Sequence, residues 1–338
     1  MAAPFGPPVG PTPSGVLPGR SRRTRWTLVA VAVAVILVAA GIAVAWWKAD
    51  SSDTSSATSP AAHVPRHYRQ TVLPFHDLKG VEDVAVSLNG DVYVADEWNN
   101  RIVMLADGTG EQTVVPFIGL DSPMGVAVDA AGTVYVADTN HHRVLALPAG
   151  SDHQTELPFT GLLRPSRVAV DAAGAVYVIS LDIPQIYRLA PGETRAVALR
   201  FTDSRSGGRG VAVDNACDVY VGRLTNTVVK ASRDTDEHTA LPFTGIDQLS
   251  SVAVGPDGTV YASGMHNNQV LELAPGADEQ TVVPAQGLNV PTAVAVDTVG
   301  NVYIADFGND RIVRMQADPP VDASGTSPAT AANCGSAL

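Results

Sequence analysis

The feature that most constrains this chain is a regular internal repeat. A Gln-Thr-x-x-Pro-Phe segment starts at Gln70, and related segments follow at 42-residue intervals, starting at Gln112, Gln154, Ala196, His238 and Gln280. Each unit then carries a Val-Ala-Val run, a Val-Tyr run and a further apolar run. These runs are short, rich in β-branched residues and separated by Gly, Asp, Asn or Pro, which is typical of strands joined by turns.

Four strands in each unit predict the blades of a β-propeller, because one blade cannot bury both of its faces alone. The order of the strands also predicts how the ring closes. The chain opens with the Gln70 segment, which we assign to the outer edge of a blade, and its last apolar run starts at Ile312. Pairing the first strand with the last three removes an open sheet edge. We therefore expect an all-β, six-bladed β-propeller over residues 70–316.

The units also resemble a known repeat. Residues 122–147, SPMGVAVDAAGTVYVADTNHHRVLAL, are similar to the NHL repeat. The runs QTVVPF and GVAVDAAGTVYVAD are similar to the extracellular sensor propeller of mycobacterial transmembrane serine/threonine kinases. The resemblance covers residues 70–316 and implies a β-propeller with a binding or sensing role at the cell surface. Residues 1–25 contain no kinase domain, so we expect no kinase activity from this chain.

An uncharged apolar run precedes the repeats. Residues 27–47 read TLVAVAVAVILVAAGIAVAWW, and about 20 apolar residues in a helix span the hydrocarbon core of a bilayer. Four arginines lie before this run and no acidic residue does, which places residues 1–26 in the cytoplasm. The alternative is a cleaved signal peptide, because residues 43–45 offer an Ala-Val-Ala site. We favour a retained transmembrane helix, since a signal peptide usually has a shorter apolar region.

This interpretation divides the rest of the chain. The Pro- and Gly-rich residues 1–26 form a basic cytoplasmic segment that is able to bind a cytoplasmic partner. Residues 48–69 form a polar extracytoplasmic linker, and residues 317–338 form a flexible tail. The expected location is the cytoplasmic membrane, with a single span, the N-terminus inside and the propeller outside.

The charge of the predicted ectodomain excludes one class of function. The whole chain has a formal net charge of -12, and from Lys48 onward 18 basic residues face 34 acidic ones. A nucleic-acid-binding protein needs a cationic face that neutralises phosphates. We therefore expect no nucleic-acid partner.

Three units share an Asp and an Arg at a fixed spacing. The pairs are Asp96 with Arg101, Asp138 with Arg143, and Asp306 with Arg311. The other three units lack both residues, and this joint loss is expected if the two form an ion pair across one loop. We interpret them as structural rather than catalytic.

The sequence offers no converging catalytic group. The positions expected nearest the propeller axis are Ala and Val, and neither a Gly-x-Ser-x-Gly motif nor an HExxH motif is present. His141, His142 and His266 lie in loops on one face, but two adjacent histidines point in different directions, and His266 lies three units further on. We expect no cofactor and no metal site. The alternative is a metal-dependent surface hydrolase or lyase, because such enzymes occur on similar propellers.

The expected binding surface is the face opposite the membrane linker. Its loops are non-repeating and carry Trp98, His141, His142, His266 and Phe307, and recognition usually lies in loops on a rigid scaffold. Trp98 and Phe307 belong to units on either side of the closure, so they are candidates for a single apolar anchor. We therefore expect a membrane-anchored sensor or scaffold that binds an extracytoplasmic ligand or protein.

The chain has two cysteines. Cys217 replaces a glycine found at the same turn in other units, and Cys334 lies in the tail beyond Gln316. The stretch from Gln316 to Cys334 is long enough to reach that turn, at up to ~3.3 Å per residue. A disulfide between Cys217 and Cys334 is therefore a hypothesis for an oxidising compartment.

Overall fold

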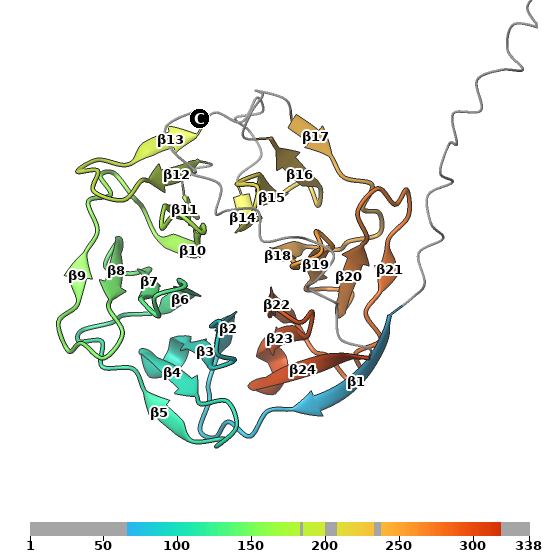
Figure 1. Ribbon diagram of the computed structural model, residues 1–338, viewed down its shortest axis with the longest axis horizontal. Coiled ribbons are helices and arrows are strands. Elements are labelled where there is room, and N and C mark those ends of the chain that lie inside the picture. The colour runs from blue at the N-terminus through green and yellow to red at the C-terminus, as the bar shows by residue number, and fades with distance from the viewer. Residues whose placement is uncertain (1–65, 183–184, 200–207, 233–237, 319–338) are drawn as a thin grey trace, which may run out of the picture. The chain divides into compact units, whose positions relative to one another are not determined.

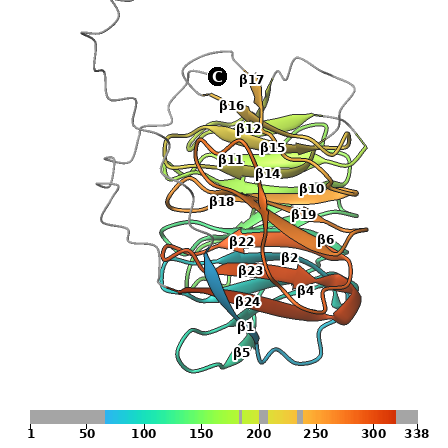
Figure 2. The same cartoon turned by 90° about the vertical axis from the view of Figure 1, so that its right-hand side faces the viewer.

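The computed structural model describes residues 66–182, 185–199, 208–232 and 238–318. Within these ranges the chain forms six four-stranded antiparallel sheets arranged as a ring, which confirms the predicted six-bladed propeller (Figure 1). Seen from the side, the strands run across the thickness of the ring (Figure 2). The predicted helix at residues 27–47, the segment 1–26 and Cys334 lie outside the described residues.

The first three blades follow the same order, from the strand nearest the axis to the rim. Blade 1 contains β2 (Val81–Val86), β3 (Val92–Asp96), β4 (Arg101–Leu105) and β5 (Gln112–Val114). Blade 2 contains β6 (Pro123–Val128), β7 (Val134–Asp138), β8 (Arg143–Leu147) and β9 (Thr155–Glu156). Blade 3 contains β10 (Pro165–Val170), β11 (Val176–Ser180), β12 (Ile186–Leu189) and β13 (Val197–Leu199).

The other three blades complete the ring. Blade 4 contains β14 (Gly208–Val213), β15 (Val219–Arg223), β16 (Val228–Ala231) and β17 (His238–Ala240). Blade 5 contains β18 (Leu249–Val254), β19 (Val260–Gly264), β20 (Gln269–Leu273) and β21 (Thr281–Val282). Blade 6 contains β22 (Pro291–Val296), β23 (Val302–Asp306), β24 (Arg311–Asp318) and, at its rim, β1 (His67–Val72).

The ring closes as the strand order predicts. β1 pairs antiparallel with β24, from His67 opposite Asp318 to Val72 opposite Val313 (Figure 1). β1 begins at His67, inside the segment that the sequence assigned to the linker, and β24 runs past Gln316 to Asp318. The closing pair is longer than the other rim pairs, because no turn joins these two strands.

The hydrophobic core consists of six clusters, each lying between two neighbouring blades. The cluster between blades 6 and 1 includes Val81, Val94 and Ile312, none of which is exposed. A corresponding cluster lies between every other pair of adjacent blades. Burial of apolar surface therefore depends on the neighbouring blade, and the ring is stabilised as one unit.

Two faces of the ring follow from the strand directions. The connector face carries the loops between the second and third strands, such as residues 97–100, and the blade-to-blade connectors, such as residues 115–122. The turn face carries the turns between the first and second strands, such as residues 87–91, and those between the third strand and the rim strand, such as residues 106–111. The start of β1 and the end of β24 lie at the turn face.

Candidate functional site

The connector face is organised by the three Asp–Arg pairs. In blade 1, Oδ2 of Asp96 lies 2.6 Å from Nε of Arg101, and the Asp96 side chain is completely buried. Oδ1 of Asp96 accepts the backbone N–H of Lys79 at 2.7 Å. Arg101 also donates from Nη2 to the carbonyl oxygen of Asp77 at 2.8 Å. The pair therefore holds the β3–β4 loop against the connector that precedes its own blade.

Blades 2 and 6 repeat this arrangement. Asp138 and Arg143 are 2.7 Å apart, and Asp306 and Arg311 are 2.6 Å apart, with both carboxylates fully buried. In blade 3 a single hydroxyl takes the place of the carboxylate, and among the described residues Ser180 bonds through it only to the backbone of Leu163. Hydrogen bonds between charged groups are shorter and stronger than neutral ones, so the connectors of blades 1, 2 and 6 are the more firmly held.

His141 belongs to the pair of blade 2. Its Nδ1 lies 3.0 Å from Oδ2 of Asp138. Asn99 and Asn309 occupy the same position in blades 1 and 6, and each donates at 2.8 Å to the carboxylate of its own blade. At this loop position, Asn99, His141 and Asn309 therefore play the same part in their own blades, as partners of the buried aspartate.

His142 forms a bond between blades. It adopts a left-handed conformation with φ of 59°, and its Nδ1 accepts the backbone N–H of Arg164 in blade 3 at 3.0 Å. Left-handed residues at the same position make the same bond to the next blade, through Asn100, Asn226, Asn268 and Asp310. In this bond Nδ1 of His142 takes the acceptor role that the amide or carboxylate oxygen has in the other blades.

His266 stands apart from the other two histidines. Its Nδ1 lies 3.6 Å from Oδ1 of Asp247, and 61% of its side chain is exposed. The structure does not bring the three predicted histidines together. In the described part of the chain, no group of three or more His, Cys, Asp or Glu side chains is placed to hold a metal ion.

Trp98 and Phe307 meet across the closure of the ring. Each lies in a short 3₁₀ turn, η1 (Glu97–Asn99) of blade 1 and η2 (Phe307–Asn309) of blade 6. Their ring centroids are 5.4 Å apart and their planes are nearly perpendicular, the edge-to-face geometry that aromatic pairs prefer. Trp98 is 63% exposed. The aromatic pair is therefore a single apolar feature on the connector face.

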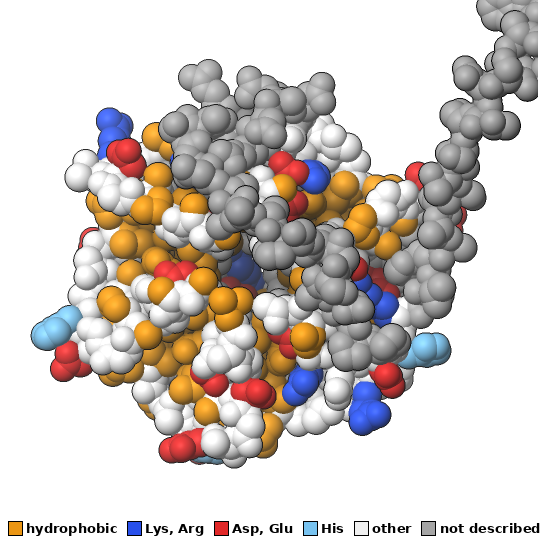
Figure 3. Space-filling view, viewed as in Figure 1, with side chains coloured by type: hydrophobic (Ala, Val, Ile, Leu, Met, Phe, Trp, Pro, Cys, Tyr) orange, Lys and Arg blue, Asp and Glu red, His pale blue; other side chains and the backbone are white. Residues whose placement is uncertain are grey.

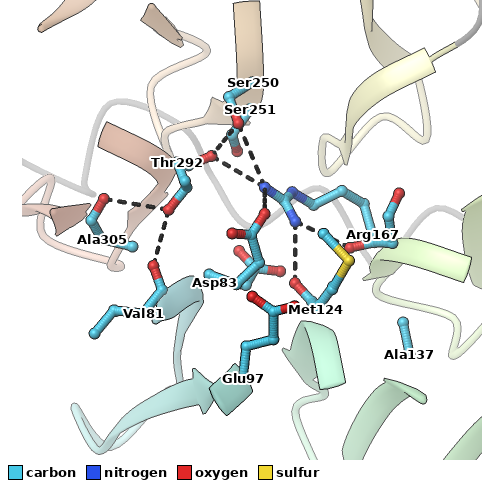
Figure 4. Close-up of polar contacts among 12 residues, drawn as sticks. Val81, Asp83, Glu97, Met124, Ala137, Arg167, Ser250, Ser251, Thr292 and Ala305 are labelled. Carbon is cyan, nitrogen blue, oxygen red and sulfur yellow. Dashed lines mark hydrogen bonds and ion pairs between the residues drawn. The ribbon is translucent and has the colours of Figure 1, made fainter. Parts of the chain in front are cut away.

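A second polar cluster lies at the mouth of the axial channel, near the connector face. Arg167 extends from β10 across the axis, with Nη2 3.2 Å from Oε1 of Glu82 and 3.1 Å from the carbonyl oxygen of Thr292 (Figure 4). Its Nη1 donates to the carbonyl oxygen of Met124 at 3.0 Å. Nη2 also lies 3.5 Å from Oγ of Ser250, so one side chain connects blades 1, 2, 5 and 6 to blade 3 near the axis.

The carboxyl groups of this axial cluster are strongly perturbed. Burial raises the pKa of Glu82 to about 7, and this effect outweighs the attraction of Arg167. Burial likewise raises the pKa of Asp83 to about 6, against the lowering effects of Arg167 and of backbone N–H groups of Val84 and Val126. Two carboxyl groups near the axis therefore titrate close to neutral pH.

The predicted Ala and Val positions line the axis, but the sequence analysis missed polar residues at this end of the channel. The Val-Ala-Val positions do line an axial cavity of about 210 Å³, but Asp83, Arg167 and Ser251 line it as well. These polar residues immediately precede the Val-Ala-Val run, where β-bulges shift the strand register. They differ from unit to unit, so the repeat pattern alone gave no signal for them.

Residues 120–147 match the model of the NHL repeat. No curated protein sequence matches the chain. Among solved structures, a gluconolactonase from Xanthomonas campestris is similar, with 14% identity, a TM-score of 0.62, and coverage of 76% of this chain and 96% of that one. A streptogramin B lyase has 18% identity, a TM-score of 0.56, and coverage of 72% and 81%. A chain of a nidogen/laminin complex has 19% identity, a TM-score of 0.57, and coverage of 62% and 82%. At these identities the likeness shows the propeller fold alone.

The repeated tyrosines have hydroxyl partners on the turn face. Tyr135, Tyr177, Tyr220 and Tyr303 each donate to an aspartate at the preceding turn, at 2.9–3.1 Å: Asp129, Asp171, Asp214 and Asp297. The same aspartates accept backbone N–H groups within the turn, as Asp129 does from Ala131. Burial raises the pKa of Tyr135 to about 12, so this hydroxyl remains a donor at physiological pH.

Cys217 occupies the turn position that the sequence indicates. Its φ is 66°, in the region where Gly132 and Gly174 lie at the same turn of other blades, and only 2% of the residue is exposed. Its predicted partner Cys334 lies outside the described residues. Among the residues described here, no helix is long and apolar enough to cross a membrane.

Proposed function

We propose that this protein is a recognition module that binds an extracytoplasmic ligand or protein through the connector face of its propeller. The observation that carries the proposal is the aromatic pair Trp98–Phe307, in which Trp98 is exposed and is packed edge-to-face against the half-buried Phe307. Binding energy at protein interfaces is concentrated in a few residues, among which Trp is enriched. Rigid aromatic side chains also lose little conformational entropy on binding.

The surroundings of the aromatic pair fix it before any ligand arrives. Gly80 lies directly beneath Trp98, and a Cβ at this position would stand 2.8 Å from Cγ of the indole. Gly80 has a φ of 64°, and its N–H donates to Oδ1 of Asp310 at 2.7 Å. This bond connects blade 1 to the loop that carries Phe307. The pair is thus held by contacts from both sides of the closure.

Other exposed apolar side chains share the connector face. Ile118 is 71% exposed and Leu163 is 45% exposed, each in a blade-to-blade connector. Glu97, beside Trp98, accepts a hydrogen bond from Ser122 at 2.6 Å and adds a negative charge near the axial mouth. A central aromatic anchor with apolar and acidic neighbours suits a protein or peptide partner.

Residues 27–47 supply the second part of the proposal, a retained membrane anchor that keeps the propeller outside the cytoplasmic membrane. The uncharged apolar run and the arginines before it support this placement. The similarity of the repeats to sensor propellers of mycobacterial transmembrane kinases supports a sensing role. Protease treatment of intact cells tests the topology. Digestion of the propeller from outside is expected, and full protection of the propeller would contradict it.

Capture from cell-envelope extract with the full chain tests the binding surface. Partners retained by the native chain are expected to be lost from Trp98→Ala and Phe307→Ala, with unchanged thermal unfolding. Val282→Ala is the matched control, because Val282 is 51% exposed on the rim strand β21. Retention that is equal in all four proteins would contradict the proposed surface.

A second candidate is a surface hydrolase or lyase. The axial cluster favours it, because perturbed carboxyl groups such as Glu82 and Asp83 are common at catalytic sites. The structural likeness to a gluconolactonase and a streptogramin B lyase is compatible with it. Assays against gluconolactone and streptogramin B, with Glu82→Gln as control, distinguish the two. Turnover by the native chain that is lost in Glu82→Gln would support the hydrolase or lyase hypothesis. No turnover by the native chain, even after a stoichiometric amount of metal is added, would contradict this hypothesis.

A further inference from the structure

Each blade places a tyrosine near the turn face, and four of the six blades place a cation beside it. The tyrosines are Tyr93, Tyr135, Tyr177, Tyr220, Tyr261 and Tyr303. In blades 3, 4 and 6 the cation comes from the third strand of the same blade. Arg188 lies 5.8 Å from the ring centroid of Tyr177, Lys230 lies 5.2 Å from that of Tyr220, and Arg314 lies 5.9 Å from that of Tyr303. These distances allow a cation–π interaction.

Carboxylates complete the arrangement. In blade 4, Nζ of Lys230 lies 2.7 Å from Oδ2 of Asp218, which stands just before the Val-Tyr run of Tyr220. In blade 3, Nε of Arg188 donates to the hydroxyl of Tyr177 at 3.1 Å, and that hydroxyl donates to Asp171. In blades 3 and 4 the groove beside the tyrosine therefore holds a positive charge that polar groups of the same blade bind.

Blade 5 obtains its cation from elsewhere in the chain. Its third strand carries Glu272 at the position of Lys230, and Arg66, just before β1, fills the groove instead. Arg66 donates to the hydroxyl of Tyr261, to Asp257 and, at 3.2 Å, to Thr259. Tyr68 follows it into the groove and donates from its hydroxyl to Glu272 at 2.6 Å. The groove of blade 5 thus holds an Arg-x-Tyr segment.

Blade 1 has the same groove without an occupant from the described residues. Met104 stands where Lys230 stands in blade 4, and Asp91 stands in the place of Asp218. Tyr93 of blade 1 is also the exception among the six tyrosines. Within the described ranges its hydroxyl makes no hydrogen bond, whereas the hydroxyl of each of the other five does.

A cavity marks this position. A groove of about 880 Å³ between blades 1 and 2 is lined by Asp91, Tyr93, Met104, Asp129 and Asp152 among others, and none of the lining residues that the structure describes is Lys or Arg. On the face viewed in Figure 3, acidic side chains lie beside hydrophobic ones over these two blades. The volume lies within the range of ordinary ligand pockets.

The groove of blade 5 is filled from the rim of blade 6, so the corresponding groove of blade 1 would have to be filled from the rim of blade 2. The rim of blade 2 is built differently, and this groove stays open. Strand β1 continues freely to Arg66, whereas β8 and β9 are joined by the turn at residues 148–153. Aligning the repeats of blades 6 and 2 places Arg66 and Tyr68 opposite Gly150 and Asp152. A glycine and a short aspartate leave unfilled the space that an arginine and a tyrosine occupy in blade 5.

We propose that the groove between blades 1 and 2 binds an extended basic peptide segment of a partner protein, placing an arginine between Tyr93 and Asp91 and an aromatic side chain over Met104. The chain's own Arg66–Tyr68 segment in blade 5 shows the chemistry that such a groove accepts. The negative net charge of the protein favours the approach of a basic segment. This groove lies on the turn face, so it is separate from the aromatic pair of the connector face.

A labelled peptide tests the proposal with the full-length chain. The probe has the sequence of residues 64–70, VPRHYRQ, and binding is measured by fluorescence anisotropy. Met104→Lys supplies an internal cation like that of blade 4 and is expected to weaken binding about tenfold or more. Asp91→Asn is expected to weaken it as well, and so is alanine in place of the first arginine of the peptide.

The controls separate the groove from other sites. Val197→Lys adds the same charge on the rim strand β13 of blade 3, where Val197 is 50% exposed, and is expected to leave binding unchanged, as is Met104→Leu. Thermal unfolding establishes that each variant is folded. Binding that survives both Met104→Lys and Asp91→Asn would place the peptide elsewhere, for instance by exchange with β1 at blade 5, and would overturn the proposal. Absence of any binding to the native chain would overturn it too.

Discussion

The connector face has two unlike halves. In blades 6, 1 and 2, which are adjacent in the ring, a buried aspartate binds an arginine, a connector N–H and an amide or imidazole side chain. In blades 3, 4 and 5 the same position holds Ser180, Arg223 and Gly264. The aromatic pair stands on the first half. One half of an otherwise repetitive ring is therefore held rigidly where an exposed anchor needs fixed support.

Removing one carboxylate tests this difference most severely. Asp138→Ala leaves Arg143 and the N–H of Asp121 without their buried partner, and should lower the free energy of unfolding by about 3 kcal/mol. Ser180→Ala in blade 3 removes only neutral hydrogen bonds and should lower it by about 1 kcal/mol. Chemical denaturation measures both. Equal losses would show that the two halves are alike in stability.

The pH dependence of the free energy of unfolding tests the axial cluster separately from the Asp–Arg pairs of the connector face. The unfolded chain releases the Glu82 proton near pH 4.5, while the folded chain keeps it until about pH 7. The folded state binds more protons in this window, so its stability falls as pH rises, by an amount on the order of 3 kcal/mol. Glu82→Gln should flatten this slope and leave the connectors of blades 6, 1 and 2 unchanged. A slope equal to that of the native chain would contradict the assignment to Glu82.

The bond between blades 2 and 3 joins the two halves. His142→Ala removes the acceptor of the Arg164 N–H from a left-handed residue, and should cost about 1–2 kcal/mol of stability. His142→Asn restores the residue that other blades use and should be nearly neutral. Thermal unfolding of both variants measures the effect. A His142→Asn variant as unstable as His142→Ala would mean that the imidazole has another role.

The smallest expected effect comes from building a pair in the other half. Gly264→Asp with Gln269→Arg introduces the Asp–Arg spacing into blade 5. A Cβ at residue 264 would meet only the side-chain amide of Asn267 closely, at 2.2 Å, and that amide is able to turn and donate to the new carboxylate. The double variant should gain up to about 1 kcal/mol of stability. Gln269→Arg alone is the control and should gain nothing.

Much of this architecture was predictable from one sequence, because the six repeats act as an internal comparison. The joint loss of Asp and Arg in three units indicated their contact, and the strand order indicated the pairing of β1 with β24. Trp98 and Phe307 lie in the first and the last unit, which become neighbours when the ring closes, and this indicated that their rings are close. The first two of these inferences rest on positions that recur from one repeat unit to the next, and the third rests on the closure of the ring.

The axial cluster was not predicted from the sequence, because its residues do not repeat from one unit to the next. Arg167 bonds groups from four blades, and the corresponding positions hold Asp83 and Gly125 in blades 1 and 2. Such a contact depends on which blades face each other across the channel, which periodicity does not show. The role of His142 was visible in principle, because Asn100 stands at the same position of the preceding unit, but its position relative to blade 3 required the structure.

Hydrogen exchange at equivalent connector amides tests the difference between the halves most directly. The N–H groups of Lys79, Asp121 and Asn289 bond buried carboxylates at 2.6–2.8 Å, whereas that of Leu163 bonds a hydroxyl at 3.2 Å. We expect the first three to exchange at least about tenfold more slowly than Leu163 after correction for intrinsic rates. Asp138→Ala should abolish the protection of Asp121 alone. Equal protection of all four amides in the native chain would contradict the claim that the half of the face carrying the aromatic pair is the rigid one.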